Sequence, residues 1–273
     1  MKNFTKNPVG APVWSSLLLL ICLAQPLAAQ KKISISKELQ ATAEEWPVKN
    51  KFQGFGKITG YIFGPYRVVT SKRKRWITTK EATNFKGTKS QSVMEFDFSF
   101  TLRNAHADTA KVYANYYGKE TASHSFELLT LGDVTISSGE DAITSDEKVF
   151  LVAINTTASD TSRWVMQVER NLEADGIYRT YGVLHRGNRQ IAIRQVSSLK
   201  PGEGWGFKIP ALGYEFIEND YPLGVVQYMG GGMGGQNKKF VWLRKDADPD
   251  INLVLAAAMT ALMEWEFILF YIQ

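Results

Sequence analysis

Histidines are the side chains most often used for metal binding and proton transfer, and they are sparse in this sequence. His106, His124 and His185 are isolated from one another. None belongs to an HxH, HxxxH or HExxH pattern, which would place two metal ligands on one face of a strand or helix. We interpret them as surface or hydrogen-bonded structural residues, and we expect no metal site and no cofactor.

Carboxylates and a glycine run are the next candidates for chemistry. Glu95 and Asp97 share one face of a predicted strand, a spacing that can serve acid–base catalysis or cation binding but is also common on solvent-facing strands. The run Gly230–Gly235 leads through Lys238 and Lys239 into a strand, whereas a phosphate loop opens onto a helix N-terminus, so a flexible hairpin is favoured. No catalytic constellation is recognisable, and we expect a protein that is not an enzyme.

The best candidate for a binding site is a run of four cations followed by an indole: Lys72, Arg73, Lys74, Arg75 and Trp76. Four consecutive cations cannot all be paired locally, and tryptophan suits the interface between water and lipid or sugar. The alternatives are a solvated hairpin loop and a binding patch. As a patch, this run predicts binding to an anionic lipid or membrane surface.

A second functional hypothesis uses aromatic side chains instead of charge. In this hypothesis the protein assembles with an envelope protein or binds a carbohydrate through exposed tyrosines: Tyr113, Tyr116, Tyr117, Tyr178 and Tyr181. Nucleic acid is not expected as a partner. The whole chain has a net charge of +5, and without its first 29 residues the charge is only +3, far from a dedicated basic stripe.

The N-terminus has the order of regions found in a secretory signal peptide. Lys2 and Lys6 precede a mostly apolar run, Val13–Ala24, and small residues close the segment at Pro26–Ala29. The run is shorter than the roughly 20 residues that span a bilayer. We predict a signal peptide at residues 1–29, although an uncleaved anchor and a buried helix remain alternatives.

Export follows from this prediction and places the protein in a bacterial periplasm, the cell envelope or the medium. The chain's single cysteine, Cys22, lies inside the apolar run. A lipidated cysteine usually follows a small residue, whereas Ile21 precedes this one, so we do not expect a lipid anchor. The mature chain would then contain neither disulfides nor thiol-based sites.

The remainder, residues 30–273, is predicted to be a single β-rich domain. The clearest strand covers Val93–Leu102, where Met94, Phe96, Phe98, Phe100 and Leu102 alternate with polar residues. A short helix is expected from Ser36 to Trp46, with Ser36 as its N-cap and Pro47 ending it. Other predicted strands are Gly56–Phe63, Tyr66–Thr70, Lys111–Tyr117, Phe126–Leu131, Val149–Ile154, Trp164–Glu169, Ile177–His185, Gln190–Val196, Tyr214–Ile217, Val225–Met229 and Phe240–Leu243.

The C-terminus breaks this β pattern. Asp248 provides an N-cap and Pro249 a first helical residue, and the helix over Ile251–Met263 has no polar face. A helix that is apolar all round must be buried in protein or in a membrane. Glu264 and Glu266 break the apolar run at about 13 residues, too short to span a bilayer. We therefore predict a helix enclosed by a β-sheet.

This ending resembles the tubby-like, LURP-one-related and phospholipid-scramblase superfamily. The similarity lies in Phe240–Leu243, Asp248–Asp250 and Leu253–Met263, which look like the last strands and the plugging helix of that family. The resemblance implies an antiparallel barrel of about 12 strands around a central helix, and a β-sandwich with a packed C-terminal helix is the alternative.

Overall fold

The computed structural model describes residues 32–74, 78–83, 89–123, 126–131, 134–138, 142–157, 163–172, 178–199, 209–231 and 238–272. The predicted signal peptide lies outside these residues. The two helices of the described part are α2 (Lys37–Thr42) and α3 (Pro249–Ile272). Its strands are β1 (Ala43–Pro47), β2 (Lys49–Lys51), β3 (Gly60–Phe63), β4 (Tyr66–Arg73), β5 (Thr78–Thr83), β6 (Lys89–Arg103), β7 (Thr109–Ser123), β8 (Phe126–Leu131), β9 (Val134–Ser138), β10 (Ala142–Thr156), β11 (Trp164–Leu172), β12 (Tyr178–Arg186), β13 (Arg189–Ser197), β14 (Leu212–Glu218), β15 (Tyr221–Met229) and β16 (Phe240–Arg244).

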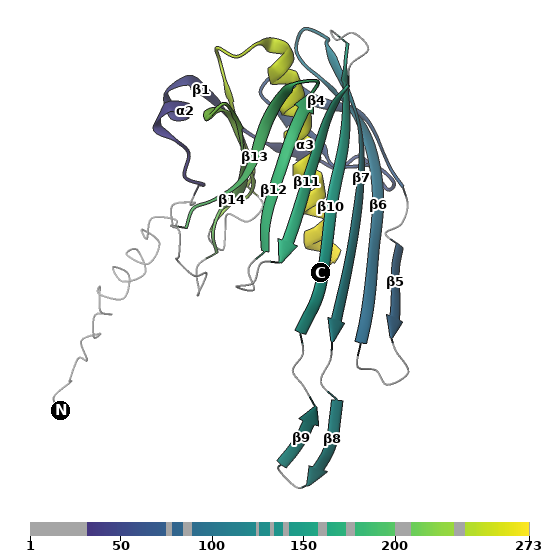
Figure 1. The fold of residues 1–273 in the computed structure, drawn as a ribbon. Coiled ribbons are helices and arrows are strands. Elements are labelled where there is room, and N and C mark those ends of the chain that lie inside the picture. The colour runs from purple at the N-terminus through teal and green to yellow at the C-terminus, as the bar shows by residue number, and fades with distance from the viewer. Residues whose placement is uncertain are drawn as a thin grey trace, which may run out of the picture.

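Antiparallel strands form a nearly closed barrel around α3 (Figure 1). The pairing order is β1-β16-β15-β14-β13-β12-β11-β10-β7-β6-β4-β3-β2, and β5 also pairs with β6. The two edge strands are consecutive in the chain with only Val48 between them, so one stretch of backbone pairs first with β16 and then with β3. The predicted barrel around a central helix is confirmed, and the alternative of a sandwich is wrong.

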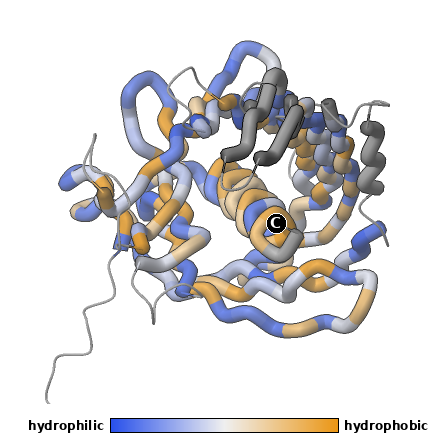
Figure 2. Tube along the Cα trace, turned by 90° about the horizontal axis from the view of Figure 1, so that it is seen from below, coloured by the Kyte–Doolittle hydropathy of each residue, from blue (hydrophilic) through white to orange (hydrophobic). Residues whose placement is uncertain are grey.

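Alternation of side chains along the strands separates the core from the surface. On β6 the side chains of Phe96, Phe98, Phe100 and Leu102 are buried, as the sequence pattern predicts. Seen along the barrel axis, the strands surround the helix (Figure 2). Beyond the barrel, the hairpin β8–β9 projects past the ends of β7 and β10 (Figure 1).

Helix α3 fills the barrel because nearly every side chain on it is apolar. Ala256, Ala257 and Ala258 are fully buried, and their small size lets strands approach the helix closely. At Gly224 on β15 a Cβ atom would lie 2.7 Å from the backbone carbonyl oxygen of Trp242, which cannot move aside, so only glycine fits there. The helix is long and apolar enough to cross a bilayer, yet 89% of its most apolar window is buried in the barrel.

Several element boundaries differ from the sequence predictions, and those of the helices have a clear physical reason. Helix α3 does not end at Met263 but continues to Ile272, because arginines of the barrel wall neutralise Glu264 and Glu266. The N-terminal helix is capped by Ser36 as predicted, with the Leu39 amide donating to Ser36 Oγ at 3.2 Å. That helix ends at Thr42 instead of Trp46, since the following residues pair with β16 as β1.

Candidate functional site

The predicted basic run does not lie at a hairpin. Lys72 and Arg73 belong to β4, which ends with Arg73 opposite Phe98 of β6. Strand β5 begins at Thr78, opposite Glu95 of β6. It pairs with the same edge of β6 as β4 does, and it runs in the same direction as β4. The chain therefore does not reverse between β4 and β5, and the interpretation as a hairpin loop is wrong. Arg75 and Trp76 lie outside the described residues.

The guanidinium group of Arg73 is engaged inside the barrel, although 31% of the side chain is exposed. This group forms an ion pair with Glu264, whose side chain is fully buried on α3. The same carboxylate accepts hydrogen bonds from the Tyr61 hydroxyl at 3.0 Å and from the Thr59 amide at 3.2 Å. Burial raises the pKa of Tyr61 well above its usual value, so the phenol stays protonated and can donate. Arg73 therefore holds the central helix in place.

Lys72 and Lys74, by contrast, are exposed on the outside of the barrel. The Lys74 ammonium donates to Asp97 of β6 at 2.8 Å, and this hydrogen bond raises the pKa of the lysine. Because 77% of the Lys74 side chain is exposed, water screens the pair and a ligand can reach the ammonium. Two of the predicted binding residues thus share one outer face.

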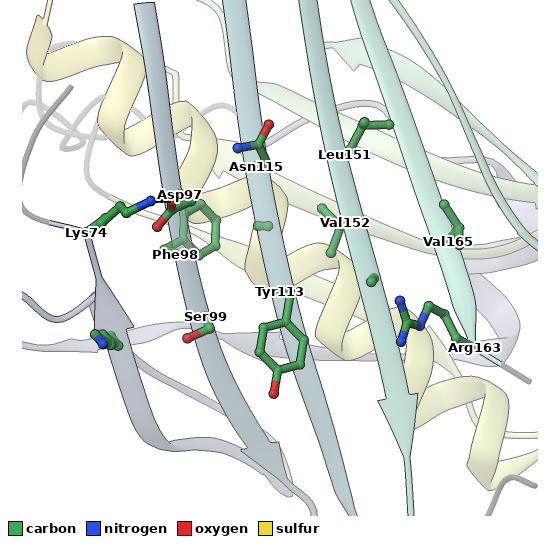
Figure 3. Close-up of a pocket in the computed structure, with 13 residues that line it drawn as sticks. Lys74, Asp97, Phe98, Ser99, Tyr113, Asn115, Leu151, Val152, Arg163 and Val165 are labelled. Carbon is green, nitrogen blue, oxygen red and sulfur yellow. Dashed lines mark hydrogen bonds and ion pairs between the residues drawn. The ribbon is translucent and has the colours of Figure 1, made fainter. Parts of the chain in front are cut away.

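A groove of about 630 Å³ begins at these two lysines and crosses the outer wall (Figure 3). Its floor follows from the register of the strands, since Ser99, Tyr113, Ala153 and Val165 are successive cross-strand neighbours on β6, β7, β10 and β11. The next row of the floor includes Leu151, which is 44% exposed. An exposed apolar floor of this kind can accept an alkyl chain or a ring.

The ends of the groove are cationic. Arg163 lies at the end away from Lys72 and Lys74. A smaller hollow of about 310 Å³ shares Lys72 and Tyr113 with the groove and adds Lys111. Among the described residues, Asp97 is the single carboxylate that lines either hollow, so the cations there outnumber the acidic groups. The arrangement can bind an anionic head group and an apolar body together.

Most of the predicted tyrosines lie on the surface, with one exception. Tyr113 and Tyr181 are 57% and 53% exposed, and Tyr178 is 36% exposed. Tyr116 is 1% exposed and stacks on Phe96 at 4.8 Å, so its prediction as a contact residue is wrong. The reason is the strand period, because Tyr116 and Tyr117 are adjacent and must face opposite sides of the sheet.

The other candidates do not assemble into a site. Glu95 is exposed, while Asp97 is paired with Lys74. Within the described residues no cluster of histidine, cysteine, aspartate or glutamate has the geometry to hold a metal ion. His124 and most of the glycine run lie outside those residues.

Sequence reasoning missed the groove itself. The sequence predicts Tyr113 as an aromatic contact but not Leu151, Val165 or Arg163, because these residues are far apart in the chain and become neighbours only through strand register. One usable signal was present: residues 46–80 contain nine lysines and arginines and no acidic residue. A count of charge by segment would have found the basic side of the barrel.

Comparison of the chain with models of protein families, with curated proteins and with solved structures gives no match.

Proposed function

We propose that this protein binds an anionic amphiphile, a lipid of the bacterial envelope, in the outer groove and does no chemistry on it. The observation that carries the proposal is the groove's composition. Exposed Lys72, Lys74 and Arg163 lie at the ends of a floor that includes Leu151 and Val165. A lipid with an anionic head group and an acyl chain matches this arrangement, because the head group can contact the cations while the acyl chain lies on the apolar floor.

The rest of the molecule is consistent with a binding role. The interior is filled by α3 and by stacked aromatic rings, such as Phe150 on Trp265 at 4.9 Å, which leaves the outer wall for the ligand. We further propose export through the N-terminal segment, which would bring the barrel to the envelope where such lipids occur. Membership of the tubby-like superfamily remains a prediction based on the C-terminal strands and helix.

The test uses a soluble lipid so that membrane adsorption does not contribute. Calorimetry with lysophosphatidylglycerol below its critical micelle concentration should show saturable binding, and lysophosphatidylcholine should bind less well. The double variant Lys72→Gln/Lys74→Gln and the single variant Leu151→Asp should each weaken binding at least roughly fivefold, since a desolvated charge contact or a buried apolar contact contributes about 1–2 kcal/mol.

The matched control is Lys37→Gln/Lys245→Gln, which removes the same charge from exposed positions outside the groove. It should leave the affinity unchanged. Binding of the wild type should also fall as salt rises from about 0.1 M to 1 M, because the Debye length shrinks from about 10 Å to 3 Å. Failure of the wild type to bind either lysolipid, with binding of soluble cell-wall oligosaccharides instead, would support the carbohydrate hypothesis through Tyr113.

A further inference from the structure

The loop between β2 and β3 carries two exposed phenylalanines. Phe52 is 78% exposed and Phe55 is 99% exposed, more than any other large apolar side chain in the described residues. Their rings meet edge to face, with centroids 6.0 Å apart. Single exposed apolar residues are common, but a pair of rings that contact mainly each other is an apolar unit presented to solvent.

The backbone holds this loop in a defined shape. Gly54 and Gly56 flank Phe55 with φ angles of +102° and +75°, a region that favours glycine. The Gly56 carbonyl accepts a hydrogen bond from the Arg73 amide at 2.8 Å, which fixes the loop to the end of β4. Ile58, directly after the loop, is buried in the core. The base of the loop is therefore anchored while its tip projects from the barrel.

The charge along this part of the chain is of one sign. Lys51 and Lys57 are exposed beside the phenylalanines, and the basic segment 46–80 contains nine lysines and arginines without an acidic residue. Because the whole chain has a net charge of only +5, the remaining residues are together net negative. A second copy of this surface would be repelled, whereas an anionic surface would be attracted.

We infer that the loop 52–57 inserts Phe52 and Phe55 into the surface of an anionic bilayer while the neighbouring lysines contact the head groups. Aromatic rings beside cations are the combination that holds peripheral proteins at the boundary between head groups and acyl chains. The inference rests on the proposed function, because Arg73 links the loop to the strand that also carries Lys72. Docking by the loop would bring the groove to the membrane that supplies its lipid.

The test measures sedimentation of the exported form of the protein with vesicles of phosphatidylglycerol and phosphatidylcholine in equal parts. The double variant Phe52→Ser/Phe55→Ser should reduce the partition coefficient at least roughly tenfold, since each buried ring is expected to contribute about that factor. The control Ile62→Ser/Val69→Ser removes two exposed apolar side chains elsewhere and should change it little. Pure phosphatidylcholine vesicles should bind all three proteins weakly.

The same variants separate this inference from the proposed function. Calorimetric binding of lysophosphatidylglycerol should be unchanged in Phe52→Ser/Phe55→Ser, because neither residue lines the groove. If vesicle binding is also unchanged, the loop does not insert, although the groove can still bind lipid. If the wild type binds vesicles through the loop but binds no lysolipid, the groove proposal fails and the loop remains a membrane anchor.

A spectroscopic measurement tests insertion directly. Because Cys22 is the chain's single cysteine, a Phe55→Cys variant in a Cys22→Ser background can be labelled at one position with a polarity-sensitive dye. Addition of anionic vesicles should increase the emission and shift it to the blue, and the same dye at Lys245→Cys should not respond. A dye at position 55 that reports water while the protein is bound to vesicles would overturn the inference.

Discussion

Glu264 and Glu266 are separated by one residue on α3, yet they are ion-paired with opposite walls of the barrel. Glu264 binds Arg73 of β4, and Glu266 binds Arg170 of β11 and the Tyr214 hydroxyl. Residues two apart on a helix project about 200° from each other, which explains how both walls are reached. The two pairs fix the rotation and the depth of the helix inside the barrel.

The first prediction concerns Arg73. Replacement by glutamine should lower the free energy of unfolding by about 3–5 kcal/mol, because Glu264 would be left as a buried charge without its partner. Urea denaturation followed by fluorescence measures the change. Lys72→Gln is the matched control, since this neighbouring cation is exposed, and it should shift stability by less than about 0.5 kcal/mol.

A double variant separates the pairing from general damage to β4. In Arg73→Met/Glu264→Met both charges are removed and apolar side chains take their place, which is often neutral or stabilising in other proteins. Stability near that of the wild type is therefore expected. If the double variant loses as much stability as Arg73→Met and Glu264→Met lose together, the two residues do not stabilise the fold as a pair.

The Arg73 contact also affects how binding can be tested. Neutralising Lys72, Arg73, Lys74 and Arg75 together is not a clean test of binding, because it also removes the ion pair of Arg73 with Glu264.

Local pattern was sufficient to predict the type of most elements. Two patterns have the same cause, since the side chains must face a dry interior: the alternation at Val93–Leu102 and the apolar side chains on all sides of α3. Enclosure of the helix followed too, since a helix with no polar face cannot lie on a surface.

Pairing between distant residues could not be predicted in this way. In the sequence Glu264 only interrupts an apolar run, and its burial depends on Arg73 and Tyr61, which lie 191 and 203 positions earlier. The groove has the same origin, because Tyr113, Ala153 and Val165 are adjacent solely through the register of three strands. Chain separation hides both features from any argument based on neighbouring residues.

The second prediction concerns Ala257, which is fully buried at the middle of α3. Ala257→Asp should unfold the domain, because a carboxylate there has neither water nor a partner and costs several kcal/mol out of a total stability of about 5–15 kcal/mol. Circular dichroism and solubility measure the result. Ala192→Asp, at an exposed position on β13, should remain folded. An Ala257→Asp protein with an unchanged melting midpoint would show that the helix is not internal.

The third prediction concerns the start of the mature chain. Cleavage after Ala29 would leave Gln30 as the first residue. The intact mass of the exported protein should therefore lack residues 1–29. A mass that includes them would identify the segment as an anchor, and export could then be tested by its membrane association.

The last prediction uses Lys239, which lies next to the C-terminal half of α3. Its side chain is 8% exposed, and its ammonium lies over the rings of Tyr61 and Phe267 at 5.1 and 5.4 Å. Burial lowers the pKa of this lysine from 10.5 to about 8, although Glu264 and Glu266 oppose the shift. The folded protein therefore holds this proton less tightly than the unfolded chain does.

The sign of the pH dependence follows from this difference. Between pH 8 and 10.5 the unfolded chain keeps the proton that the folded protein loses, so Lys239 makes the free energy of unfolding rise with pH across this window. Below pH 8 both states are protonated, and the full destabilisation from burying the charged lysine, about 3 kcal/mol, is present.

Lys239→Met should therefore be more stable than the wild type at pH 7, and this advantage should shrink toward pH 10. Buried tyrosines such as Tyr66, whose pKa burial raises to about 12, act in the opposite direction above pH 10 but equally in both proteins. Urea titrations of the two proteins from pH 7 to pH 10 measure the difference, and parallel curves would show that Lys239 is solvated and not buried in the fold.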